Sequence, residues 1–151
     1  MGHSRGGRMD FISWLLTLIG MGSDQAMRRS DKRAEVSRLN AEVAGEVGRA
    51  LDILAMASPR LKRLASQIAS EHPELHLSIV KFLDEQQAIA LTMLKTTEDN
   101  KTKIATASGF PDWDKAVRDF QEWRITASRI PPWIQGIVDR LDAVFLENGI
   151  R

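Results

Sequence analysis

The sequence lacks most of the residue types that carry catalysis or covalent stabilisation. It has no cysteine and no tyrosine, and its only histidines are His3, His72 and His76. The absence of cysteine excludes disulfides, thiolate zinc sites and cysteine nucleophiles. Because histidine and tyrosine are frequent general acids and bases, few candidates remain for proton transfer. We therefore predict a protein with no catalytic residue, no metal and no cofactor.

A large excess of one charge and a long apolar run are also missing. The 21 lysines and arginines balance 20 aspartates and glutamates, which argues against a dedicated nucleic-acid coat protein. Residues 11–22 (FISWLLTLIGMG) carry no charge, but these twelve residues are too few for a membrane-spanning helix, which needs about 20. Any basic or membrane-facing surface must therefore be local.

The alternating pattern typical of strands is absent as well. Apolar residues recur instead at spacings of three and four, and the length suits one domain. We predict an all-α fold, namely an elongated antiparallel helical bundle of about five to six helices with two long helices and an apolar N-terminal helix. Residues 1–22 would comprise a disordered tail and this apolar helix, and residues 23–151 a single helical-bundle domain.

Caps, glycines and prolines set the expected helix boundaries. Gly20 and Gly22 would end the first helix, and Ser58 followed by Pro59 is typical of a new helix start. The predicted helices are 10–19, 24–57, 59–70, one from Pro73 to as far as Ser108, one opened by Pro111 and Asp112, and one that follows Pro131 and Pro132 and ends at Asn148 and Gly149. Residues 96–103 are polar on every side, so they form either a solvated helical extension or a frayed loop.

Apolar spacing also predicts the buried faces. The face of the second helix carries Val36, Leu39, Val43, Val47, Ala50, Leu51 and Leu54. Small residues beside it, including Gly45 and Gly48, predict a close approach of a neighbouring helix. Trp113, Trp123 and Trp133 are expected in the core or as staples at helix entries.

The N-terminal segment is the main candidate site. Its membrane-contacting residues would be Phe11, Trp14, Leu15, Leu18 and Ile19. The cations that follow them, Arg28, Arg29, Lys32 and Arg33, would meet anionic head groups. We expect this segment to hold the protein at the cytoplasmic face of a membrane.

Three other roles for the segment stay open. A signal peptide would give a protein exported after cleavage near Gly22, although Asp10 at the entry to the apolar core is unfavourable. The segment could instead pack on the bundle or on a second copy. A membrane-active, pore-forming element is the third alternative.

A second basic group, Arg60, Lys62 and Arg63, would lie in the first turn of a helix that starts at Pro59. The helix dipole disfavours cations there. Either an anionic partner binds them, or they are exposed to solvent and their small free-energy cost is tolerated. Together with the cations at 28–33 they form the anion- or lipid-binding set, and they underlie an alternative function as a nucleic-acid or phosphate binder.

The histidines near Pro73 and a pair of adjacent glutamines are best explained by structural roles. His72 and His76 flank Pro73, which moves His72 out of helical geometry, so this segment does not predict a metal site. Gln86 and Gln87 interrupt an apolar helix face, where a buried amide can set register or oligomeric state. We therefore expect a non-enzymatic interaction or adaptor protein that oligomerises, associates peripherally with a membrane through residues 9–22, and has a protein partner or a second copy of itself as its main partner, with nucleic acid less favoured.

Overall fold

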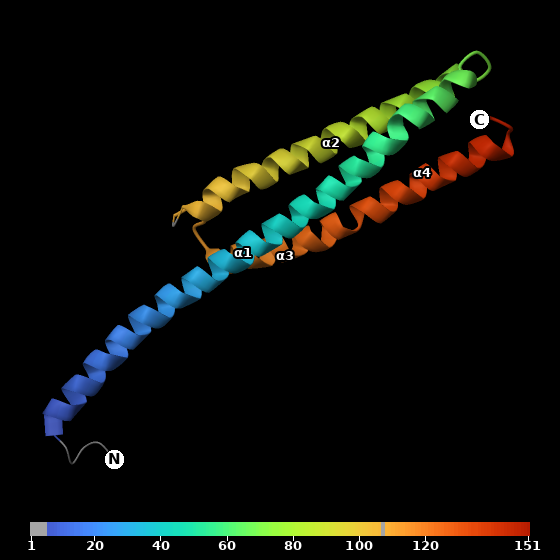
Figure 1. Cartoon of the computed structure of the whole chain (residues 1–151). Helices are drawn as coiled ribbons and strands as arrows, with labels where there is room; N and C mark the ends of the chain where they lie inside the picture. Colours follow the sequence, from blue (N-terminus) through green and yellow to red (C-terminus); the bar gives the residue numbers. More distant parts are fainter. Residues whose placement is uncertain (1–5, 107) are drawn as a thin grey trace.

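The computed structural model describes residues 6–106 and 108–151, with side chains from residue 30 onward. Its elements are four helices: α1 (Gly6–Gln67), α2 (Pro73–Ala105), α3 (Trp113–Ser128) and α4 (Ile130–Glu147) (Figure 1). The prediction of an all-α fold is confirmed. The predicted number of five to six helices is wrong, because α1 unites three of the expected helices.

The expected helix start at Ser58 and Pro59 is absent, since Pro59 lies inside α1. An interior proline costs a helix about 3 kcal/mol because it removes a hydrogen bond and its ring crowds the preceding turn. Leu54 and Leu61 are fully buried on either side of it, so the apolar stripe continues in phase and its burial offsets that cost. The bounds of α1 likewise enclose Gly20 and Gly22, where we predicted the first helix to end.

Helix α1 lies at the centre of the fold, because it contacts each of the other three helices (Figure 1). α2 returns along α1, so that Lys62 lies beside Asp84 and Asn40 lies beside Thr97. α3 and α4 follow α1 in the same direction on another flank, where Glu42 meets Arg124 and Gln67 meets Arg151. The result is an elongated bundle in which α1 has α2 on one flank and α3 followed by α4 on another.

The core follows the predicted face of α1. The residues of that face that are buried are Val36, Leu39, Val43, Val47, Ala50 and Leu54. Leu51 is only partly buried. Three apolar clusters continue from this face onto the other helices, one centred near Leu61 with α2 and α4, one near Val43, and one near Val36 with α3.

The polar residues 96–103 are helical and lie within α2. They are not a purely solvated extension, because Thr97 and Asn100 are buried against Asn40 of α1. Asn40 Nδ2 donates to the Thr97 carbonyl at 2.9 Å, and Asn40 Oδ1 accepts from Asn100 Nδ2 at 3.4 Å. Burial of these polar groups is tolerated because each has a partner; the Thr97 hydroxyl donates to the Leu94 carbonyl at 2.6 Å.

The two C-terminal helices begin and end as the sequence predicts. The Asp112 carboxylate caps α3 by accepting from the Asp114 and Lys115 amides at 3.0 and 3.1 Å. Pro131 and Pro132 open α4 after a single junction residue, Arg129. Gly149, with a φ of 73°, follows the end of α4 in the left-handed conformation that glycine adopts without strain.

Candidate functional site

The predicted membrane-contacting side chains lie outside the described residues. These are Phe11, Trp14, Leu15, Leu18 and Ile19, and the first two cations of the basic set, Arg28 and Arg29, lie there as well. The described part of the basic set begins at Lys32.

Lys32 and Arg33 both contact the start of α3. Lys32 Nζ lies 2.6 Å from a carboxylate oxygen of Asp114, and this hydrogen bond lowers the pKa of the Asp114 carboxyl below its ordinary value of 3.8. The Arg33 guanidinium lies 5.7 Å from the centre of the Trp113 ring, within range of a cation–π interaction. Two of the cations that we assigned to lipid or nucleic acid therefore help to hold α3 against α1.

The second basic group is not at a helix start, because α1 runs unbroken past it. The helix start whose dipole would favour an anionic partner for these cations is therefore absent. Arg60 pairs with Asp142 of α4, and Lys62 Nζ lies 2.5 Å from Asp84 of α2. Arg63 is exposed and makes no ion pair among the described residues.

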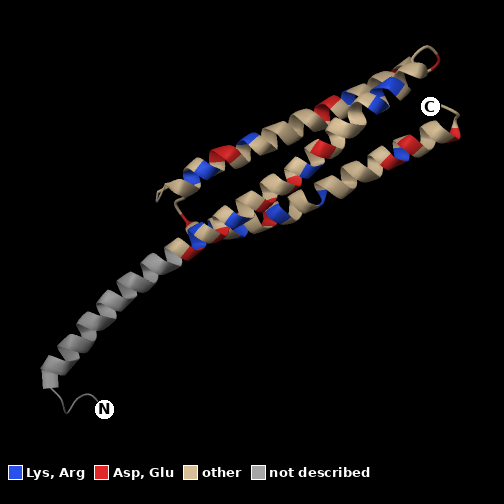
Figure 2. Cartoon of the chain, in the orientation of Figure 1, with Lys and Arg blue, Asp and Glu red and all other residues tan. Residues whose placement is uncertain are grey.

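These two basic groups do not form one surface. Lys32 and Arg60 are 28 positions apart on α1, which is about 42 Å at 1.5 Å per residue. Arg60 and Lys62 also point to opposite flanks, one toward α4 and one toward α2. Basic and acidic residues alternate along the bundle in Figure 2, so the described part shows no extended surface of one sign.

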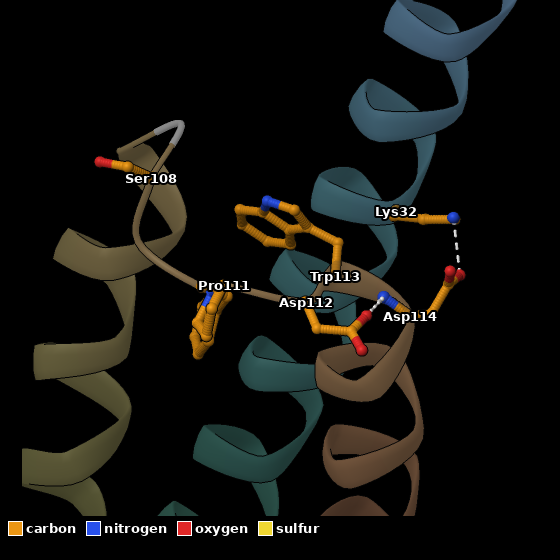
Figure 3. Close-up of a pocket in the computed structure, with 7 residues that line it drawn as sticks. Lys32, Ser108, Pro111, Asp112, Trp113 and Asp114 are labelled. Atoms are coloured by element: carbon orange, nitrogen blue, oxygen red, sulfur yellow. Dashed lines mark hydrogen bonds and ion pairs between the residues drawn. The ribbon is translucent and has the colours of Figure 1, made fainter.

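A hollow lies where α1 meets the segment between α2 and α3. It has a volume of about 610 Å³ and is lined by Lys32, Ser108, Phe110, Pro111, Asp112, Trp113 and Asp114 (Figure 3). Its walls combine an aromatic pair, Phe110 and Trp113 with ring centres 5.1 Å apart, with two carboxylates. Both carboxylates already have structural partners, since Asp112 caps α3 and Asp114 pairs with Lys32. The hollow therefore offers no poised acid or base.

Titratable groups elsewhere also serve structural roles. Arg38 bonds to Glu35 at 2.5 Å, which lowers the pKa of the Glu35 carboxyl and raises that of Arg38. Both residues lie on the surface of α1 in an i, i+3 pair typical of helices. No set of three potential ligands that could hold a metal ion occurs among the described residues. His72 precedes Pro73, which begins α2 as predicted.

Large apolar side chains are exposed along the bundle. They include Met56 on α1, Leu75, Leu77, Ile89 and Leu91 on α2, Ile125 on α3, and Trp133, Val144 and Leu146 on α4. The expectation that Trp133 belongs to the core is wrong, since about half of this residue is exposed. Trp113 and Trp123 do pack against the core clusters. Gln86 and Gln87 are both half-buried.

Four of these exposed residues, together with the partly buried Phe82, are what we call the α2–α4 face: Leu75, Phe82, Ile89, Trp133 and Val144. The rings of Phe82 and Trp133 meet edge to face with centres 6.1 Å apart, which joins α2 to α4. Leu75 and Val144 line a common hollow of about 430 Å³ near the ends of the two helices. The exposure of Trp133 was not predictable from the sequence, because the apolar pattern of a single helix does not reveal how much of its apolar face other helices cover.

The described residues contain no helix with an apolar stretch long enough to cross a membrane. Neither a known protein family, nor a curated protein, nor a solved structure matches this chain.

Proposed function

We propose that this elongated helical bundle is a non-enzymatic interaction protein that oligomerises and is held at a membrane surface through residues 9–22. The observation that carries the proposal is the α2–α4 face, where four large apolar side chains stay about half-exposed. Charged groups of the bundle, in contrast, pair with one another across its helices. The bundle therefore exposes apolar side chains that a partner could cover, whereas these charged side chains already have partners within the chain.

The membrane part of the proposal rests on residues 11–22. In a helix Phe11, Trp14, Leu15, Leu18 and Ile19 would share one face, while Ser13 and Thr17 would lie on the opposite one. Burial of one leucine side chain in the acyl boundary contributes ~2 kcal/mol. Five such side chains are enough for reversible binding, and nearby cations add attraction to anionic lipid.

The nucleic-acid alternative draws less support from the bundle. Lys32, Arg33, Arg60 and Lys62 each have a partner inside the chain, and the two groups lie far apart along α1. A nucleic-acid backbone is bound by several cations presented together. We therefore place lipid and protein ahead of nucleic acid.

Flotation with vesicles of mixed zwitterionic and anionic lipid tests the proposal. The variant Leu15→Asp/Leu18→Asp should lose binding by on the order of 100-fold or more, since it removes two apolar side chains and adds two charges. The control Ser13→Asp/Thr17→Asp adds the same charge to the opposite face and should still float. Equal loss in both variants, or no flotation of the unaltered protein, would contradict a membrane-facing apolar surface. Release of a trapped dye would identify the pore-forming alternative.

A further inference from the structure

We propose that residues 108–113, which we call the α3 entry, contact the lipid head groups when residues 9–22 bind a membrane. The inference deepens the membrane part of the proposed function and rests on it. Its basis is that α1 is one uninterrupted helix from Gly6 to Gln67, so residues 9–22 and the bundle share a single helix (Figure 1). A continuous helix fixes which side of the bundle turns toward the membrane.

The apolar positions of α1 keep one phase along the helix. Eighteen residues make five turns of an α-helix, so residues eighteen positions apart lie on the same side. Val36 and Leu54 follow this rule, and both are fully buried. Leu18 lies eighteen positions before Val36, and Phe11 lies twice that number before the buried Val47. The side of α1 that would face lipid is therefore the side that carries the core farther along the helix.

That side of α1 points between α2 and α3. Val36 belongs to one apolar cluster with Ile104 of α2 and Phe120 of α3. In Figure 1 α1 continues past the ends of both helices, so the covered part of α1 begins where α2 ends and α3 starts. The α3 entry lies at this point. It is thus on the lipid-facing side of α1 and close to the residues that would bind the membrane.

The packing distance between helices sets the tilt of α1. Lys32, which pairs with Asp114 just after the α3 entry, lies ten positions beyond Gly22, or about 15 Å along the helix axis. With α1 flat on the membrane, α2 and α3 would lie deeper than α1 and bring charged side chains among the acyl chains, which is costly. Because packed helix axes are about 8–10 Å apart, a tilt of roughly 30–40° raises the α3 entry to the head groups.

The side chains of the α3 entry suit the head-group layer. Phe110 and Trp113 are both partly exposed, and their rings meet with centres 5.1 Å apart. Aromatic side chains, tryptophan in particular, are enriched at this depth of a membrane. The Asp112 carboxylate accepts from two amides of α3, and the adjacent Asp114 pairs with Lys32. The entry therefore offers aromatic rings to lipid, while its acidic groups have partners within the chain.

A charge introduced at Ser108 tests this contact. Ser108 and Ser70 are exposed serines in the connections at opposite ends of the bundle. With vesicles of zwitterionic and anionic lipid, Ser108→Lys should tighten binding of the full chain by about fivefold, and Ser108→Glu should weaken it by a similar factor. Ser70→Lys and Ser70→Glu should change binding by less than about twofold, because salt screens charges over about 10 Å.

A fluorescent probe measures the same contact directly. The chain has no cysteine, so Ser108→Cys, Ser70→Cys and Ala34→Cys each provide one labelling position. Ala34 is exposed and lies two positions before Val36, which is about 200° around α1, so it serves as a control on the opposite side of the helix. Vesicles that carry a nitroxide on the lipid head group should quench the probe at position 108 roughly threefold or more relative to the other two.

The outcomes separate this inference from the membrane anchor. Flotation of the unaltered protein with an unquenched probe at position 108 would overturn the inference alone, since α1 would then bend between residues 9–22 and the bundle. Stronger quenching at position 34 than at 108, or equal effects of Ser108→Lys and Ser70→Lys, would also overturn it. No flotation of the unaltered protein would overturn the proposed function, and this inference with it.

Discussion

Removal of the Asn40 side chain should destabilise the bundle more than removal of any exposed polar side chain of α1. Asn40 is only 2% exposed and bonds to two groups of α2, the Thr97 carbonyl at 2.9 Å and the Asn100 amide at 3.4 Å. Asn40→Ala therefore loses a good hydrogen bond and a long one, and it leaves a buried Asn100 amide group without its acceptor.

The expected cost follows from these two effects. A hydrogen bond contributes about 1 kcal/mol net, and a stranded buried polar group costs about 1–3 kcal/mol. We expect Asn40→Ala to lower the free energy of unfolding by ~2–3 kcal/mol, which corresponds to roughly 4–12 °C in Tm for a chain of this size.

Urea unfolding followed by circular dichroism measures the change, with the exposed Ser37→Ala as control. A double-mutant cycle with Asn100→Ala should show a coupling of about 0.5–1 kcal/mol, because the double variant no longer strands an amide. A cost of Asn40→Ala within 0.5 kcal/mol of the control, or strictly additive losses, would refute the bonding role of this pair.

Four further substitutions test the fold. Gly109→Ala should destabilise the protein by ~2 kcal/mol, because its Cβ would lie 1.7 Å from the Lys103 carbonyl oxygen. Gly48→Ala should stabilise it by about 0.5–1 kcal/mol, since a Cβ there meets nothing within 4 Å. Thermal unfolding measures both changes, and Tm shifts of the same sign in the two variants would contradict these expectations. Pro59→Ala should stabilise by ~1–3 kcal/mol in the same assay, because it relieves an interior proline of α1, and a lower Tm would indicate that the proline fits a required bend. The lowered pKa of Asp114 means that its bond to Lys32 contributes stability above about pH 4 and loses it as the pH falls through the folded-state pKa. The free energies of unfolding of Asp114→Asn and of the unaltered protein should therefore converge as the pH falls below the folded-state pKa of Asp114, and a difference that stays constant with pH would contradict this assignment.

Local signals predicted the C-terminal half of the fold well. Asp112, the Pro131–Pro132 pair and Gly149 act on their own neighbours, so their effects are visible in a short window of sequence. Ser58 and Pro59 give an equally clear local signal, yet the helix continues, because burial of Leu54 and Leu61 depends on distant partners. Tertiary packing outweighed a local preference there.

Residues distant in sequence explain the remaining differences. Residues 96–103 contain no apolar stripe, and nothing near them reveals that Asn40, 57 positions from Thr97, supplies a polar partner. The small residues around Gly45 and Gly48 predicted a close helix approach, but these glycines face open space. Similarly, a list of cations does not reveal that Lys32 and Arg60 have acidic partners on other helices. The α2–α4 face could not be predicted because exposure depends on where the other helices end.

Fractionation of cells that express a C-terminally tagged chain tests the central claim most directly. Full-length protein and a version without residues 1–22 would be compared, with the mass of each read on a gel. We predict that the full-length protein enters the membrane pellet uncleaved and that the deletion releases it. Soluble, uncleaved full-length protein would contradict membrane association, and a shortened exported product would show that the segment is a signal peptide.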